Sequence, residues 1–223
     1  MRIGKLLPGL VGLGVVMTVA VGYARGGWAI VTVETLPDHL NAGRTIPIDF
    51  TVRQHGVSLM DDLSPKVHVS MNGESSVVYA RPTSHKGTYR AEITPKGSAP
   101  ASVDIRTGFG DANLALLPIP VLAAGATPVK QALHERGRDL FVAKGCVSCH
   151  THSAVKAGKS AEFLKAPDLT TVRYTPEYLR AFITDPTIKT PTMPLRMPAL
   201  GLKPDELNAV VSFLTTTEKV AAR

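Results

Sequence analysis

Apolar and polar residues alternate in several short runs between residues 26 and 122. Alternation with a period of two is typical of strands that bury one face. Turn-forming clusters such as Asn41-Ala42-Gly43 and Asn72-Gly73 separate the runs. About seven short strands at this spacing predict an antiparallel sandwich of immunoglobulin-like size. The alternating runs include Ile46–Val52, Val67–Met71 and Thr88–Ile93, and further strands are expected at the β-branched run Trp28–Val33, at Ser102–Arg106 and at Leu114–Val121.

Helical periodicity replaces this alternation after residues 123–128, a linker of small residues. Apolar residues three and four positions apart predict three helices. The first lies within Val129–Lys144, the second opens at Thr175-Pro176 and closes at Asp185-Pro186, and the last begins at Pro204. Proline suits the first position of a helix because its missing N–H would have no partner there.

The beginning of the chain carries an uncharged, mostly apolar run, Leu6–Ala24, after Arg2 and Lys5. This run is longer than the apolar core of about 7–15 residues in a signal peptide. It fits the roughly 17–25 residues of a transmembrane helix. We therefore expect a single-pass anchor in the cytoplasmic membrane, with the rest of the chain outside. Cleavage after Gly22-Tyr23-Ala24 would instead give a soluble periplasmic protein.

The two cysteines of the chain both lie in Cys146-Val147-Ser148-Cys149-His150. This C-x-x-C-H motif is typical of covalent c-type heme attachment, in which two thiols bind the heme vinyl groups and the histidine binds iron. A thioredoxin-like redox pair would follow a strand, whereas the preceding residues have a helical pattern. A zinc site needs four ligands, and no second cysteine pair exists. The motif predicts one covalent heme c and, because heme c is attached outside the cytoplasmic membrane, an exported protein.

The order of motifs across residues 129–223 resembles the class I cytochrome c domain. Gly137 and Phe141 precede the heme motif, Pro167-Asp168-Leu169 follows it, and a Met-Pro pair comes before the last helix. The resemblance implies that Gly137 and Phe141 contact residues 210–214, where the first and last helices cross. The expected fold class is therefore multidomain: a transmembrane helix (residues 1–25), an all-β immunoglobulin-like sandwich (26–122), the linker (123–128) and an all-α cytochrome c domain (129–223).

The same resemblance implies the remaining heme-binding residues. A heme that only transfers electrons has a second axial ligand, and the family pattern favours Met197, with Met193 as the alternative. The carbonyl of Pro167 accepts the ring hydrogen of the proximal His150. Arg173 and Tyr174 are candidates for binding the heme propionates, or have ordinary surface roles.

Residues 28–118 resemble the YtkA-like and FixH-like families of membrane-associated β domains. The residues that carry the resemblance are Gly27–Val33, Phe50–Gly56, Gly87–Ala91 and Leu116–Pro118. These families often lie beside respiratory complexes.

The net charge of +7 is concentrated in residues 128–223, which carry fourteen basic and nine acidic side chains. A basic surface suits an acidic redox partner or anionic lipid, although ordinary surface lysines explain it as well. Nucleic acid and small-molecule substrates are not expected.

The leading hypothesis is a membrane-anchored cytochrome that transfers single electrons in a respiratory or photosynthetic chain. It would be a subunit or satellite of a membrane redox complex such as a terminal oxidase. One alternative is a small, peroxidase-like heme enzyme. Another is a copper or assembly factor acting through soft ligands of the β domain: His39, His55, His68, His85, Met60 and Met71.

Overall fold

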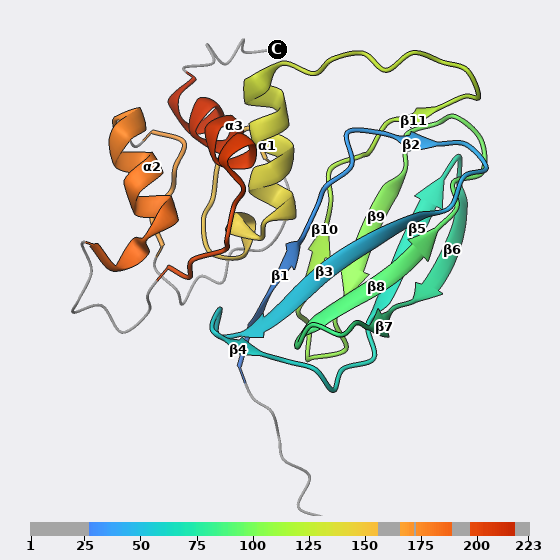
Figure 1. Cartoon of the computed structure of the whole chain (residues 1–223), viewed down its shortest axis with the longest axis horizontal. Helices are drawn as coiled ribbons and strands as arrows, with labels where there is room; N and C mark the ends of the chain where they lie inside the picture. The colour runs from blue at the N-terminus through green and yellow to red at the C-terminus, as the bar shows by residue number, and fades with distance from the viewer. Residues whose placement is uncertain (1–26, 156–165, 172, 189–196, 217–223) are drawn as a thin grey trace, which may run out of the picture.

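The computed structural model describes residues 27–155, 166–171, 173–188 and 197–216. A β region and a helical region lie next to each other, and the residues that follow β11 run across the top of the view to α1 (Figure 1). Two antiparallel sheets and one short parallel pair build the β region. The first sheet has the order β1 (Ala29–Val33), β3 (Ile46–Gln54), β8 (Thr88–Ile93) and β7 (Arg81–Pro82), with β4 (Ser58–Leu59) paired to β3. The second has the order β10 (Asn113–Ala115), β9 (Ser102–Arg106), β5 (Lys66–Met71) and β6 (Glu74–Tyr79), while β11 (Val121–Leu122) pairs with β2 (Leu40–Asn41).

Alternation of side chains explains how the two large sheets pack. In β5, Val67, Val69 and Met71 are buried, and the residues between them are partly exposed. β8 buries every second residue in the same way, including Tyr89. The buried residues of both sheets belong to one hydrophobic core, so the sheets pack face to face. The predicted strands at β1, β3, β5, β8 and β9 are confirmed.

The structure contains four short strands that were not predicted, β2, β4, β6 and β7, and β2 pairs with β11 in parallel. β6 was missed because its side chains are largely exposed and do not alternate. It pairs with β5 through a turn in which Asn72 and Gly73 both have positive φ, 50° and 81°. The predicted run Leu114–Val121 is divided into β10 and β11, because Pro118 and Pro120 cannot donate ladder hydrogen bonds.

The helical region contains α1 (Leu133–Ala143), α2 (Pro176–Thr184) and α3 (Pro204–Thr215), with short 3-10 helices η1 (Cys146–Ser148) and η3 (Pro186–Ile188). α2 begins as predicted, and the Thr175 hydroxyl accepts the Tyr178 N–H at 3.2 Å. α3 begins at Pro204, also as predicted, and the Glu206 carboxylate accepts the Lys203 N–H at 3.0 Å.

The predicted crossing of α1 and α3 is confirmed. A Cβ at Gly137 would lie 1.9 Å from the Ala209 carbonyl oxygen and 2.8 Å from Phe213 Cβ, so only glycine fits. One turn later, the rings of Phe141 and Phe213 lie 5.6 Å apart, centroid to centroid. The two helices therefore pack with their backbones in close contact.

The predicted fold class was wrong as a whole. Within the described residues, no helix has both the length and the apolar character needed to cross a membrane. Leu6–Ala24, the predicted anchor, lies outside the described residues. The C-terminal part is also not simply all-α, since non-helical segments and an isolated β-bridge between His152 and Val155 connect its short helices. Prolines such as Pro167 and Pro198 in these segments disfavour longer helices.

Candidate functional site: the heme-attachment motif

The C-x-x-C-H motif begins immediately after α1. Gly145 turns the chain with a left-handed φ of 81°, and η1 follows directly. The backbone N–H groups of Cys149 and His150 both donate to the Cys146 carbonyl, at 3.1 and 2.9 Å. This tight turn brings the two thiols and the imidazole together on one short segment.

A hydrogen bond orients the imidazole of His150. Its Nδ1 lies 2.9 Å from the Pro167 carbonyl oxygen, in the arrangement that the family resemblance implied. A carbonyl only accepts, so Nδ1 carries the proton and Nε2 keeps its lone pair. Burial lowers the pKa of His150, and the bond to Pro167 partly offsets this. A neutral imidazole with a fixed tautomer is the form that binds iron.

The two cysteines are half-buried thiols and form no disulfide. Burial raises the pKa of Cys146 to about 12 and that of Cys149 to about 11. A thioredoxin-like pair needs a thiolate with a lowered pKa, so these values argue against that interpretation.

Five apolar side chains of the helical region are half-buried and pack against the hydrophobic core: Val155, Leu169, Ile183, Leu202 and Leu214. In α2, Leu179 is the one buried side chain. The rings of Tyr174, Tyr178 and Phe182 stack in sequence, with centroids 5.0 and 5.7 Å apart. Two thiols, an oriented imidazole and partly exposed apolar groups together fit a flat, largely apolar heme.

Met197 is half-buried and begins the segment that leads into α3. Leu200, three residues later, is buried. The alternative ligand Met193 lies outside the described residues. His152 has a packing role, because its ring lies 4.4 Å from that of Phe213 and 6.2 Å from that of Phe141.

The two proposed propionate-binding residues lie on the surface. Arg173 donates from Nη1 to the Thr170 carbonyl at 2.9 Å, and Tyr174 is 40% exposed. These observations do not test binding of a propionate, so the role of both residues stays a prediction.

The structure shows packing roles for three of the six soft ligands of the β region. Met60 and Met71 are buried in the sandwich core. The ring of His55 packs on Trp28 at 5.7 Å. Across the part of the chain that the structure describes, no three His, Cys, Asp or Glu residues form a group that could hold a metal ion.

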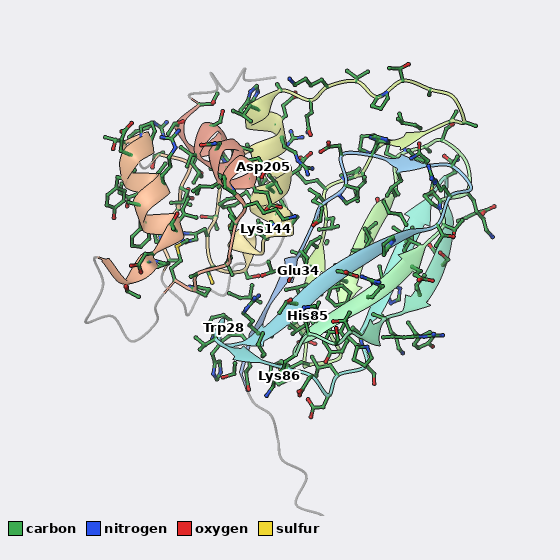
Figure 2. All side chains as sticks on the ribbon, in the orientation of Figure 1. Trp28, Glu34, His85, Lys86, Lys144 and Asp205 are labelled. Carbon is green, nitrogen blue, oxygen red and sulfur yellow. The ribbon has the colours of Figure 1, made fainter. Side chains whose placement is uncertain are left out.

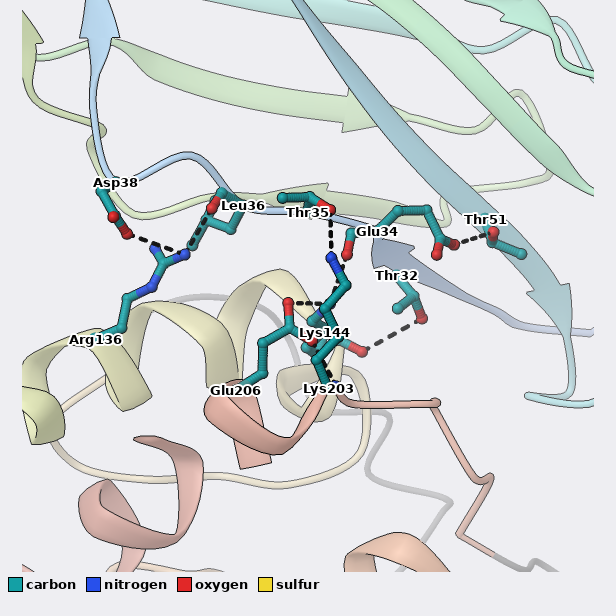
Figure 3. Close-up of polar contacts among 10 residues, drawn as sticks. All are labelled: Thr32, Glu34, Thr35, Leu36, Asp38, Thr51, Arg136, Lys144, Lys203 and Glu206. Atoms are coloured by element: carbon teal, nitrogen blue, oxygen red, sulfur yellow. Dashed lines mark hydrogen bonds and ion pairs between the residues drawn. The ribbon is translucent and has the colours of Figure 1, made fainter. Parts of the chain in front are cut away.

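A buried ion pair beside the motif was not predicted from the sequence. Lys144 Nζ lies 2.8 Å from Glu206 Oε1, and their side chains are only 3% and 6% exposed. Lys144 also donates to the Glu34 carbonyl of the β region at 3.0 Å, as Figure 3 shows. Figure 2 places Lys144 and Glu34 where the two regions meet. The one sequence signal was a lysine at the end of an amphipathic helix, which normally indicates an exposed residue.

Comparison with known proteins agrees with this site. Residues 134–218 match the family model of cytochrome c. The C-terminal part of the chain is therefore a cytochrome c domain, which implies covalently bound heme c, and Cys146 and Cys149 fit the attachment motif. No curated protein matches the chain.

Among solved structures, the similarities are distant. A candidate glycoside hydrolase from Bacteroides vulgatus is 14% identical over 40% of this chain and 17% of its own, with a TM-score of 0.32. The Lin-41 filamin domain is 13% identical over 42% of this chain and 91% of its own, with a TM-score of 0.36. The ZirS C-terminal domain is 10% identical over 55% of this chain and 85% of its own, with a TM-score of 0.32. The chain thus spans about a sixth of the first of these proteins (17%).

Proposed function

We propose that this protein carries single electrons through one heme c, bound by thioether bonds to Cys146 and Cys149 and by His150 to iron. The observation that carries the proposal is the contact of His150 Nδ1, in the C-x-x-C-H motif, with the carbonyl of Pro167. This bond orients the imidazole and increases its basicity as a ligand. The heme supplies the ferric–ferrous couple.

Met197 is the proposed second axial ligand. Its thioether is neutral and soft, which favours ferrous iron and raises the reduction potential. A site with six ligands has no open position for peroxide, which distinguishes an electron carrier from a peroxidase-like enzyme. Met197 lies just before α3, as the family pattern implies, and its half-buried side chain is consistent with a ligand that faces a bound group.

The proposed setting is the outer face of the cytoplasmic membrane, because heme c is attached outside the cytoplasm. There the protein would serve a respiratory or photosynthetic chain, as a subunit or satellite of a redox complex such as a terminal oxidase. The resemblance of residues 28–118 to YtkA-like and FixH-like domains and the basic charge of residues 128–223 support this setting. Electron transfer to an acidic partner should slow as ionic strength rises, because salt screens the attraction.

A denaturing gel stained for heme tests the covalent attachment. The wild-type protein should give a heme-stained band at 23.7 kDa, or somewhat lower if a signal peptide is removed. The variant with both Cys146→Ser and Cys149→Ser should give none. Heme that is lost from the wild type by acid-acetone extraction would contradict the proposal.

A further inference from the structure

The turn between β3 and β4 lies directly against the segment that carries Met197. Gly56, in this turn, has a left-handed φ of 73°. A Cβ on Gly56 would lie 3.1 Å from Pro198 Cγ and 3.3 Å from Ile30 Cδ1. The backbone of the turn therefore packs on the proline ring next to Met197, and a methyl group at residue 56 would make a tighter contact than is usual.

The turn is held in place by the β region itself. The His55 N–H donates to the Trp28 carbonyl at 2.9 Å, and the rings of these two residues are in contact. The Val57 N–H donates to the Gln54 carbonyl at 3.0 Å, which closes the turn. Since the turn belongs to a regular sheet, it offers Pro198 a fixed surface.

The same region also contacts the other side of the heme motif. A Cβ on Gly145, the residue before Cys146, would lie 2.5 Å from the Val31 carbonyl oxygen of β1. The Thr32 hydroxyl lies 3.4 Å from the Lys144 carbonyl oxygen, to which it donates. One rigid β region thus touches both the attachment segment and the segment of the proposed distal ligand.

We propose that the β region positions the distal ligand of the heme, and that Gly56 is the positioning residue. The inference rests on the proposed role of Met197. By fixing Pro198 relative to Gly145, the β region limits how far Met197 moves from the iron. Loss of this contact increases the population in which methionine is dissociated, and the apparent affinity for an external ligand rises in proportion.

Gly43 provides a matched control for the test. Its φ of 71° is nearly that of Gly56, but no atom lies within 4 Å of its Cβ position. Asparagine tolerates the left-handed conformation, so Gly56→Asn and Gly43→Asn carry similar backbone costs. Only the first places a side chain against Pro198.

The measurement is the binding of imidazole to the ferric holoprotein, together with the Met–iron absorption band at about 695 nm. Gly56→Asn should weaken the band, lower the midpoint potential and bind imidazole about tenfold more tightly than the wild type. Gly43→Asn should match the wild type in all three. Thermal unfolding of both variants shows whether a general loss of stability accounts for the difference.

A double variant tests the contact itself. The change Pro198→Ala removes the Cγ atom that a methyl group at residue 56 would meet, so Gly56→Ala and Pro198→Ala should not have independent effects on imidazole affinity. Independent effects, or equal results for Gly56→Asn and Gly43→Asn, would overturn the positioning role and leave the proposed function intact. A wild-type protein without the band, or with a band that Met197→Ala leaves unchanged, would overturn the ligand assignment and the positioning role together.

Discussion

The β region and the helical region bury their apolar side chains in different ways. In the β region, large side chains such as Phe50 and Tyr89 are fully buried between two sheets, and strand ladders pair the backbone groups. The helical region has three short helices, and in one of them, α2, Leu179 is the one buried side chain. The β region therefore buries its large side chains between its own two sheets. In α2, Tyr178, Phe182 and Ile183 are only half-buried, and we expect the proposed heme to cover apolar groups of this kind.

The largest expected effect comes from preventing heme attachment. In the variant with both Cys146→Ser and Cys149→Ser, α2 and the segment at Met197 should lose their protection from hydrogen exchange. β5 and β8 should keep theirs, because their buried side chains pack between the two sheets. Peptide-resolved hydrogen exchange measures both. Equal loss in the two regions would show that the β region also depends on the heme.

Breaking the buried ion pair between Lys144 and Glu206 should have the next largest effect, a decrease in the free energy of unfolding. Lys144→Met leaves the Glu206 carboxylate buried without a counter-charge, which costs about 3–5 kcal/mol in free energy of unfolding. Urea unfolding followed by circular dichroism measures this cost.

The matched control adds Glu206→Gln to Lys144→Met. The amide oxygen of glutamine still accepts the Lys203 N–H that the carboxylate accepts in the wild type. The double variant should regain most of the lost stability, because no uncompensated charge remains. A double variant no more stable than Lys144→Met would assign the loss to packing instead.

The crossing of α1 and α3 gives an intermediate effect with an informative sign. Alanine is the better helix former by about 1 kcal/mol, so Gly137→Ala would stabilise an exposed helix. Here its methyl group would overlap the Ala209 carbonyl, and overpacking of this kind costs about 1–3 kcal/mol. We expect a lower midpoint of thermal unfolding. A higher midpoint would mean that α1 and α3 can move apart to accommodate the methyl group without a loss of stability.

The smallest effect is expected on the outer face of the first sheet. Arg90 donates twice to the Asp49 carboxylate, at 2.7 Å for each bond, in a pair that solvent reaches. Water and salt screen such a pair, so Arg90→Ala should leave the unfolding midpoint within experimental error. A clear decrease in the unfolding midpoint would show that the exposed Arg90–Asp49 pair contributes to the stability of the sheet.

The features that the sequence revealed depend on neighbours along the chain. The heme motif, the N-cap at Thr175 and the helix start at Pro204 are each encoded within a few residues. Strand alternation was visible for the same reason, because it reports burial of one face.

The features that the sequence did not reveal depend on partners far along the chain. The buried Lys144 ammonium group is paired with the Glu34 backbone carbonyl and the Glu206 carboxylate, which lie far from it along the chain. The need for glycine at residues 56 and 145 arises from Pro198 and Val31. Such pairs leave no periodic signal, and a single sequence does not display them.

β1 lies at the end of its sheet, yet all five of its residues are buried. The helical region covers this edge, with Gly145 against the Val31 carbonyl and Lys144 bonded to the Glu34 carbonyl just beyond the strand. Open strand edges are the places where β proteins pair wrongly with other chains. Residues 29–122 are made before residues 133–216, so a new chain presents an uncovered edge until its helices form. Should heme attachment complete the folding of the helices, as we expect, it would also protect this edge of the β region from aggregation.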